Sequence, residues 1–353
     1  MYRLIRPLIF KLDPERAHHI TLRLLSLPIA PLLSALFDYS DPRLAVTAFG
    51  LTFRNPIGLA AGYDKNGVAL RGLAALGFGH LEAGTVTRQP QIGNPRPRVF
   101  RLPADEALIN RMGFPNDGVG KLDTRCLKNT GCLVGINIGK SIDTPLDRAA
   151  DDYCALLTQV APHADYVAIN VSSPNTPGLR QLQSKSFVDN LLQQIADTRA
   201  NLQPPTSNLQ LPILVKIAPE LSYPELDDIL DAVTANSFDG IIATNTTLSR
   251  HGLHTPAPVR DETGGLSGQP LRARSTEIIR YIFKRTEGKL PIVGVGGINS
   301  AAAALEKIRV GATLVQVYSG LIYEGPGLVR EIKKGILATG IKNAGELIGS
   351  EAT

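Results

Sequence analysis

Eight short apolar runs recur along the chain from about residue 55, and they constrain the fold more than any other feature. Each run is rich in β-branched residues and stays almost wholly apolar until its last positions, the pattern of a parallel strand buried on both faces. The runs span 57–62, 80–86, 133–139, 166–173, 213–219, 240–245, 291–297 and 313–320. Helical stretches follow several of them, for example at 186–200 and 223–235.

Eight strand–helix units in about 270 residues predict an α/β fold, a (β/α)₈ TIM barrel. A doubly wound open sheet is the alternative, but it usually carries an early G-x-G-x-x-G motif, which is missing here. Residues 1–45 lie outside the repeat. We therefore expect an N-terminal two-helix extension over 1–45 and a catalytic barrel domain over 46–353.

The N-terminal segment is the least regular part of the chain. Asp13 and Pro14 are a good helix start, with a helix expected to about residue 27 and a second one after Pro31. These helices either pack on the barrel or lie on a membrane surface, since basic residues flank them. The longest uncharged stretch, 24–37, contains two prolines and is too short to span a bilayer, and charges at 11–16 break any signal-peptide core.

Composition narrows the function classes. The 353-residue chain is 43% hydrophobic with a formal charge of +5. It has no dense Lys/Arg run and no Trp, so no nucleic acid partner is expected. The cysteines Cys126, Cys132 and Cys154 are odd in number and lack C-x-x-C spacing. Reduced structural thiols are therefore expected, with no disulfide and no metal site.

The polar residues at the run ends predict the active site, because the carboxyl ends of barrel strands meet on one rim. Two lysines and four asparagines should converge there: Lys65, Lys216, Asn137, Asn170, Asn175 and Asn245. Neutral amides can satisfy both carbonyl and N–H edges, so the rim favours a planar heterocycle such as a pyrimidine. The glycine-rich ends of the last two runs, GVGG and VYSG, favour a bound phosphate.

Lys216 and Ser173 carry the chemical hypotheses. Lys216 could reach solvent at a strand end, form a Schiff base, or place a fixed charge beside a flavin. Ser173 has no obvious base, because only His251 and His254 could reach the rim and no G-x-S-x-G motif exists. A hydrolase is therefore disfavoured, and a serine that handles one proton fits better.

Eleven stretches, in order along the chain, resemble dihydroorotate dehydrogenases of the membrane-associated, quinone-reducing class (class 2). They are LDPERAH (12–18), NPIGLAAGYDK (55–65), EAGTVT (82–87), NRMGFPNDG (110–118), GINIGK (135–140), NVSSPNTPGLR (170–180), LVKIAP (214–219), ATNTT (243–247), GGLSG (264–268), GVGGI (294–298) and VYSG (317–320).

The resemblance implies an FMN-binding barrel that oxidises (S)-dihydroorotate to orotate in pyrimidine (UMP) biosynthesis. Ser173 would take the C5 proton and FMN the C6 hydride. One FMN would be held by Ala61, Gly62, Tyr63, Asp64, Lys65, Thr85, Asn137, Asn170, Lys216, Thr244, Gly268, Gly297, Tyr318 and Ser319. Dihydroorotate would be held by Lys65, Asn110, Arg111, Met112, Gly113, Phe114, Asn170, Asn175, Asn245 and Thr246.

The resemblance also implies an electron acceptor and a location. Ubiquinone or menaquinone would reoxidise FMN in a tunnel lined by His18, Arg101 and Tyr318. The soluble class generally has cysteine at the position of Ser173, so serine points to the quinone class. We expect a monomer in peripheral contact with lipid at the cytoplasmic face of the bacterial inner membrane. The alternatives are a soluble fumarate- or NAD⁺-linked enzyme, a flavin-free Lys216 lyase, and a non-catalytic membrane-surface protein.

Overall fold

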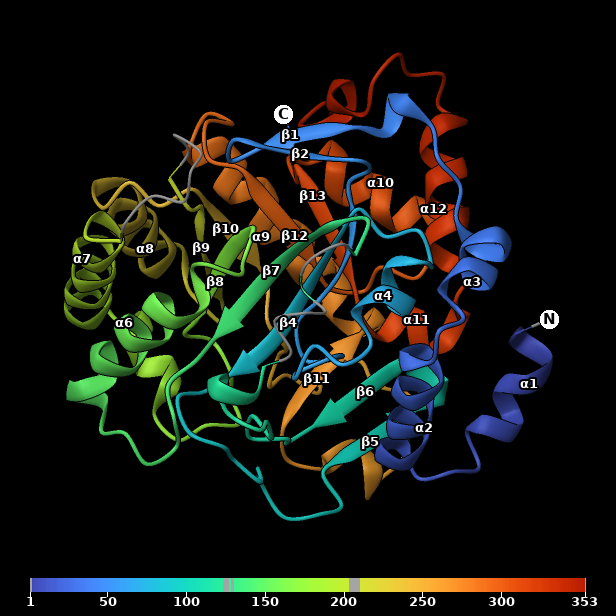
Figure 1. Cartoon of the computed structure of the whole chain (residues 1–353), viewed down its shortest axis with the longest axis horizontal. Helices are drawn as coiled ribbons and strands as arrows, with labels where there is room; N and C mark the ends of the chain where they lie inside the picture. The colour runs from blue at the N-terminus through green and yellow to red at the C-terminus, as the bar shows by residue number, and fades with distance from the viewer. Residues whose placement is uncertain (1, 123–126, 128–129, 203–209, 353) are drawn as a thin grey trace.

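A closed barrel of eight parallel strands forms the centre of the computed structural model, which describes residues 2–122, 127, 130–202 and 210–352 (Figure 1). Each predicted run supplies one strand, so the TIM barrel is confirmed. The order around the barrel is β10-β12-β13-β3-β4-β7-β8-β9. The strands are β3 (Ile57–Leu59), β4 (His80–Val86), β7 (Leu133–Ile138), β8 (Tyr166–Asn170), β9 (Ile213–Ile217), β10 (Gly240–Ala243), β12 (Ile292–Val295) and β13 (Leu314–Val317).

Two glycines make room for rings inside the barrel. A Cβ atom on Gly58 would lie 2.1 Å from Nε2 of His80, and one on Gly135 would lie 2.1 Å from the Tyr166 ring. Close packing leaves no space for both groups, so a larger residue at either position would displace the ring. The two rings belong to the first residues of β4 and β8, at the end of the barrel away from the predicted site.

Helices surround the barrel, and the two predicted over 186–200 and 223–235 are confirmed as α7 and α8. In α8, the Glu225 side chain accepts a hydrogen bond from the Ser222 backbone N–H (2.8 Å), which stabilises the helix start. The helices are α4 (Leu70–Ala74), α6 (Ala149–Val160), α7 (Lys185–Ala200), α8 (Tyr223–Ala235), α9 (Arg272–Arg285), α10 (Ala301–Arg309), α11 (Ser319–Glu324) and α12 (Leu328–Leu337).

Two small sheets were not predicted from the sequence. A hairpin of β1 (Val46–Ala48) and β2 (Leu51–Phe53) precedes the barrel, and its Phe53 ring packs 5.3 Å from that of His80. An antiparallel sheet of β5 (Val99–Leu102), β6 (Ala107–Asn110) and β11 (Gly265–Gly268) lies at the other end. The arrowheads of β4 and β7 point toward the half of the molecule that holds this sheet (Figure 1).

The N-terminal segment forms three helices, α1 (Tyr2–Ile9), α2 (Pro14–Ser26) and α3 (Ala30–Phe37). The two expected helices are α2 and α3. The helix α1 was not predicted, because it contains Pro7 and is flanked by arginines. No single described helix is long and apolar enough to cross a bilayer. Together α2 and α3 would pass on length and composition, but they are bent by 103° at their junction.

The described cysteines, Cys132 and Cys154, are free thiols, and Cys126 lies outside the described residues.

Candidate active site

A cavity with about 980 Å³ of empty space opens at the carboxyl ends of the barrel strands. Residues from loops far apart in the sequence meet there because all eight strands run in the same direction. The predicted residues on its wall are Ala61, Gly62, Lys65, Thr85, Asn110, Met112, Gly113, Phe114, Asn170, Ser173, Asn175, Lys216, Thr244, Asn245, Thr246, Gly268, Gly297, Tyr318 and Ser319.

Three asparagine side chains form a directional hydrogen-bond chain beneath this cavity. The amide of Asn245 donates to Oδ1 of Asn170 (3.3 Å), and the amide of Asn170 donates to Oδ1 of Asn137 (3.2 Å). The amide of Asn137 donates to Oε1 of Glu82 (2.7 Å), a carboxylate buried inside the barrel. Because a carboxylate only accepts hydrogen bonds, Glu82 favours one orientation of Asn137 and, through it, of the other two amides.

Lys216, the penultimate residue of β9, is a buried lysine beside that carboxylate. Its Nζ lies 4.0 Å from Oε1 of Glu82. Burial lowers the pKa of Lys216, and the negative charge of Glu82 works in the opposite direction. The negative charge of Glu82 thus favours the protonated form of Lys216 at the cavity floor, against the effect of burial.

Lys65 is the second lysine on the cavity wall. Its Nζ donates to the carbonyl of Gly62 (2.7 Å), and burial lowers its pKa to about 8. An ammonium group with such a pKa is mostly charged near neutral pH and is only partly solvated. It can therefore bind an anionic group of a ligand.

Ser173 lies on the wall and is 5% exposed. Its Oγ accepts a hydrogen bond from the backbone N–H of Asn175 (3.3 Å). None of the six histidines lines this cavity, His251 and His254 included, and all six are among the described residues. The geometry therefore lacks a serine–histidine pair for hydrolysis, in agreement with the sequence.

The wall formed by the loops after β12 and β13 suits an anion. Gly296 and Gly297 have φ angles of 133° and 68°, and a Cβ atom on Gly297 would lie 2.4 Å from that of Arg272. Only glycine tolerates this conformation and contact, so the backbone is left open to a ligand. The helix α11 starts at Ser319, with one residue between it and the end of β13, and the first turn of a helix can bind an anion through its N–H groups.

A second cavity, with about 1670 Å³ of empty space, lies between the N-terminal helices and the barrel. Its wall is mostly apolar and includes His18, Arg101 and Tyr318. Burial lowers the pKa of His18 to about 3, which keeps its ring neutral, and raises the pKa of Tyr318 to about 12. The two cavities share five wall residues, Lys65, Asn110, Met112, Ser267 and Tyr318.

A buried ion pair, with a second and exposed arginine beside it, connects α2 to the segment that leads into β5 beside this second cavity. Glu15 accepts from Arg98 Nη2 (2.6 Å) and pairs with Arg96 Nε at 3.0 Å. Arg98 also donates to the carbonyls of Ile92 and Asn94. Because Glu15 and Arg98 are both buried, removing either would leave an uncompensated charge, so α2 has a defined position.

Four residues predicted to hold ligands lie elsewhere than on the first cavity wall. Asn137 lies one layer behind it, and Tyr63 lines the second cavity. The carboxylate of Asp64 accepts from the backbone N–H groups of Val68 and Ala69. The Arg111 side chain turns to Glu262 (2.5 Å) and lies over the Phe100 ring.

Sequence reasoning missed two buried polar residues, Glu82 and Gln316. The amide of Gln316 donates to Oε2 of Glu82 (2.8 Å), and Gln316 lines the cavity. Each is a lone polar residue in the middle of an apolar run, a signal that was available in the sequence. Among the described residues, no group of three or more His, Cys, Asp or Glu side chains could hold a metal ion.

Comparisons with known proteins agree with this geometry. The family model described as dihydroorotate dehydrogenase matches residues 43–339. The chain is 50% identical over 350 residues to "Dihydroorotate dehydrogenase (quinone)" of Gloeobacter violaceus, covering 98% of this chain and 96% of that one. It is 48% identical over 343 residues to the protein of the same name from Roseiflexus sp., covering 95% and 93%. The crystal structure of DHODH from Eimeria tenella in complex with ferulenol is similar with a TM-score of 0.89 and 38% identity, over 96% of both chains.

Proposed function

The chain belongs to the dihydroorotate dehydrogenase family, and on that basis we propose that it oxidises dihydroorotate to orotate and passes the electrons through FMN to a quinone. This reaction is a step of pyrimidine biosynthesis. One observation carries the proposal: a polar cavity with Ser173, Lys65 and the buried Lys216 shares its wall with an apolar cavity. A site for a small polar substrate and a site for an apolar electron acceptor thus lie side by side.

The residues of the first cavity fit FMN. The open backbone at Gly296 and Gly297 suits a phosphate, and the buried Lys216 offers donors to a polar ring. We assign FMN to the cofactor-binding residues predicted from the sequence, with Asn137 and Asp64 supporting the wall from behind. When bound there, FMN supplies a hydride acceptor that can hand electrons on to a quinone.

Ser173 is proposed as the base for the substrate. Its Oγ would take the proton from C5 of dihydroorotate, and the buried position of this serine excludes bulk water from that transfer. Lys65 would bind the substrate carboxylate, which suits an ammonium group with a pKa of about 8. Asn110, Asn175, Asn245 and Thr246 would bind the polar edges of the substrate ring, with Met112, Gly113 and Phe114 on the wall beside them.

The second cavity is proposed as the quinone site. Its apolar wall suits a hydrophobic ring and tail, and neutral His18, Arg101 and Tyr318 offer polar groups to the quinone oxygens. Residues 1–45 would then be a functional unit that builds this site on the catalytic domain at 46–353.

Peripheral membrane contact of a monomer is part of the same proposal, at the cytoplasmic face of the inner membrane. Nine apolar side chains of the N-terminal segment are exposed, among them Leu4 at 81%. They define an exposed apolar face and are Leu4, Ile5, Leu8, Leu12, Ile20, Leu24, Leu27, Leu32 and Leu36. Basic residues such as Arg3 and Lys11 accompany it, as expected for helices that lie in an anionic membrane interface.

The reaction is tested by anaerobic spectroscopy of the purified protein. A flavin spectrum that bleaches on addition of dihydroorotate, and recovers on addition of ubiquinone, supports the proposal. A colourless protein, or a flavin that dihydroorotate does not reduce, would contradict the proposed reaction and favour a Schiff base on Lys216. Borohydride would trap that Schiff base in the presence of substrate. Recovery with fumarate or NAD⁺ but not with quinone would place the enzyme in the soluble class.

Membrane contact is tested by sedimentation with vesicles of phosphatidylglycerol. The triple substitution Leu4→Glu, Leu8→Glu and Leu32→Glu should abolish co-sedimentation and leave flavin reduction by dihydroorotate intact. The control is Phe187→Glu, an exposed apolar residue of α7. The helix α7 lies on the other side of the molecule from α1 (Figure 1). Unchanged sedimentation of the triple variant would contradict membrane contact through this face.

A further inference from the structure

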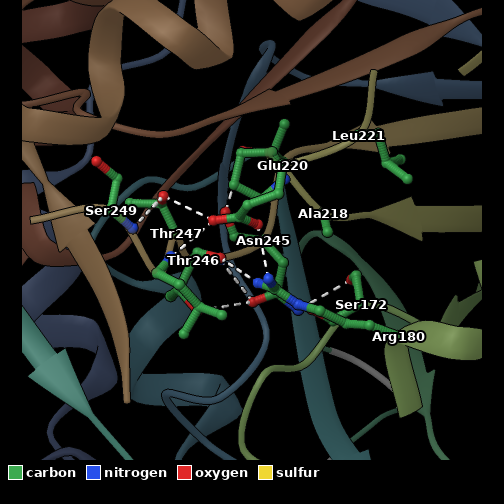
Figure 2. A network of polar contacts seen from close by, with 12 residues as sticks. Ser172, Arg180, Ala218, Glu220, Leu221, Asn245, Thr246, Thr247 and Ser249 are labelled. Carbon is green, nitrogen blue, oxygen red and sulfur yellow. Dashed lines mark hydrogen bonds and ion pairs between the residues drawn. The ribbon is translucent and has the colours of Figure 1, made fainter. Parts of the chain in front are cut away.

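The Arg180 side chain joins three loops at the rim of the barrel, as Figure 2 shows. Its Nε donates to the carbonyl of Ser172 (3.0 Å), and its Nη2 donates to the carbonyl of Thr246 (2.8 Å). Its Nη1 pairs with Oε2 of Glu220 at 2.7 Å. The three partners follow β8, β10 and β9 respectively, so one guanidinium group bridges three neighbouring strand ends.

Two of these loops carry residues of the proposed active site. The Ser172 carbonyl belongs to the peptide bond that leads into Ser173, so Arg180 holds the peptide plane directly before the proposed base. The Thr246 carbonyl belongs to a residue on the cavity wall, next to Asn245. Arg180 itself is absent from that wall. It can therefore act only through the residues that it holds.

Glu220 extends the same arrangement. Its Oε1 accepts from the Thr247 hydroxyl (2.7 Å) and from the backbone N–H of Leu248 (2.6 Å). The carboxylate thus neutralises Arg180 with one oxygen and holds the loop after β10 with the other (Figure 2). A planar guanidinium can satisfy several acceptors in fixed directions at once, which a lysine ammonium cannot do with the same geometry.

The sequence around Arg180 explains why its own position is fixed. Arg180 lies in a short 3₁₀ helix, Leu179–Gln183, whose Leu179 and Leu182 side chains are buried. The side chain of Gln183 accepts from the backbone N–H of Ala218 (2.9 Å), a second connection between the loops after β8 and β9. The guanidinium thus extends from a segment that is itself fixed by packing and by a hydrogen bond.

We propose that Arg180, with Glu220 as its partner, is a positioning residue that aligns Ser173 with the substrate bound by Asn245 and Thr246. This inference rests on the proposed function. It adds that Arg180 sets the distance between Ser173 and the bound substrate. A displacement of about 1 Å between reacting groups can cost about 10²-fold in rate. Loss of the Arg180 contacts would free both loops at once and should slow proton removal from C5.

The test compares Arg180→Gln, Arg180→Lys and Glu220→Gln holoenzymes in anaerobic stopped-flow measurements of flavin reduction by dihydroorotate. We expect the reduction rate constant to fall about 10- to 100-fold in Arg180→Gln. Arg180→Lys should lie between that variant and wild type, and Glu220→Gln should show the smallest loss because it keeps both carbonyl contacts. FMN content and the rate constant of reoxidation by ubiquinone should stay at wild-type values.

A matched control separates positioning from general stability. Arg199 pairs with Asp239 (2.7 Å) and donates to the Ser237 carbonyl (2.6 Å), a similar set of contacts at the opposite end of β10. Arg199→Gln should lower the unfolding temperature and leave the reduction rate constant unchanged. A structural role alone would reduce the amplitude of bleaching, because less enzyme would be folded, without changing its rate constant.

Isotope effects give a second readout. If base alignment is lost, removal of the C5 proton limits the reduction more strongly, so deuterium at C5 should slow Arg180→Gln by a larger factor than wild type. Wild-type rate constants in Arg180→Gln, or equal losses in both half-reactions and in FMN content, would overturn the positioning role. A wild-type flavin that dihydroorotate does not bleach would instead overturn the proposed function and the inference with it.

Discussion

Nζ of Lys216 and Oε1 of Glu82 lie 4.0 Å apart inside the barrel, with both side chains buried. The carboxylate raises the pKa of a lysine that burial lowers. The charged form of Lys216 is therefore favoured by a residue from a different strand, and that residue is not on the cavity wall.

Glu82→Gln should lower the pKa of Lys216 further, because the lysine loses its negative neighbour while its burial stays the same. The measurement is a pH titration of the lysine Nζ by heteronuclear NMR. Gln316→Glu would be unsuitable as a control, because it adds a second carboxylate to the same network. Lys307, a buried lysine remote from Glu82, serves as an internal reference whose titration should not move. An unchanged Lys216 titration would contradict the coupling.

Ser173→Ala should slow flavin reduction by about 10²–10⁴-fold, the usual contribution of a general base. Binding of orotate should remain, since orotate is the product and its binding requires no proton transfer to Ser173. The measurements are anaerobic stopped-flow reduction and orotate titration of the flavin spectrum. Ser186→Ala, at an exposed position on α7, should behave as wild type. Near-normal reduction by Ser173→Ala would refute the assignment of this residue as the base.

Orotate affinity should fall as the pH rises through about 8, the pKa to which burial lowers Lys65. The sign follows from the charge: above this pH the lysine loses its proton and no longer attracts a carboxylate. The dissociation constant should then rise about tenfold per pH unit. Lys65→Arg keeps its charge throughout and should flatten the profile. A flat wild-type profile between pH 7 and 9.5 would exclude Lys65 as the anion-binding group.

Lys307 predicts how stability depends on pH. Burial lowers its pKa from 10.5 to about 7, although its Nζ donates to Ser275 and Thr276. Between these two pKa values the unfolded chain binds more protons than the folded one, so stability rises with pH across that window. Relative to Lys307→Met, the wild type should gain roughly 1.4 kcal/mol per pH unit from pH 7 to 9. Urea unfolding at several pH values measures this difference, and a constant difference would contradict the lowered pKa.

The barrel was predictable because each strand is a short apolar run that is followed directly in the sequence by polar or glycine residues. The rim residues followed from the barrel itself, since parallel strands bring their ends together. The β5–β6–β11 sheet was not predictable in this way, because its strands have four residues each and β11 comes more than 150 residues after β6. The orientation of the Arg111 side chain could not be predicted for the same reason, because its partner Glu262 is 151 residues away in the sequence.

The proposed quinone site depends on a part of the chain that the proposed oxidation site does not use. Helices α1 to α3 form one wall of the apolar cavity and contribute nothing to the wall of the polar one. They attach through a few contacts, such as Glu15 with Arg98 and Tyr2 with the Ile322 carbonyl. Exchange of residues 2–37 for those of a relative would therefore alter the proposed quinone site and leave the wall of the polar cavity unchanged.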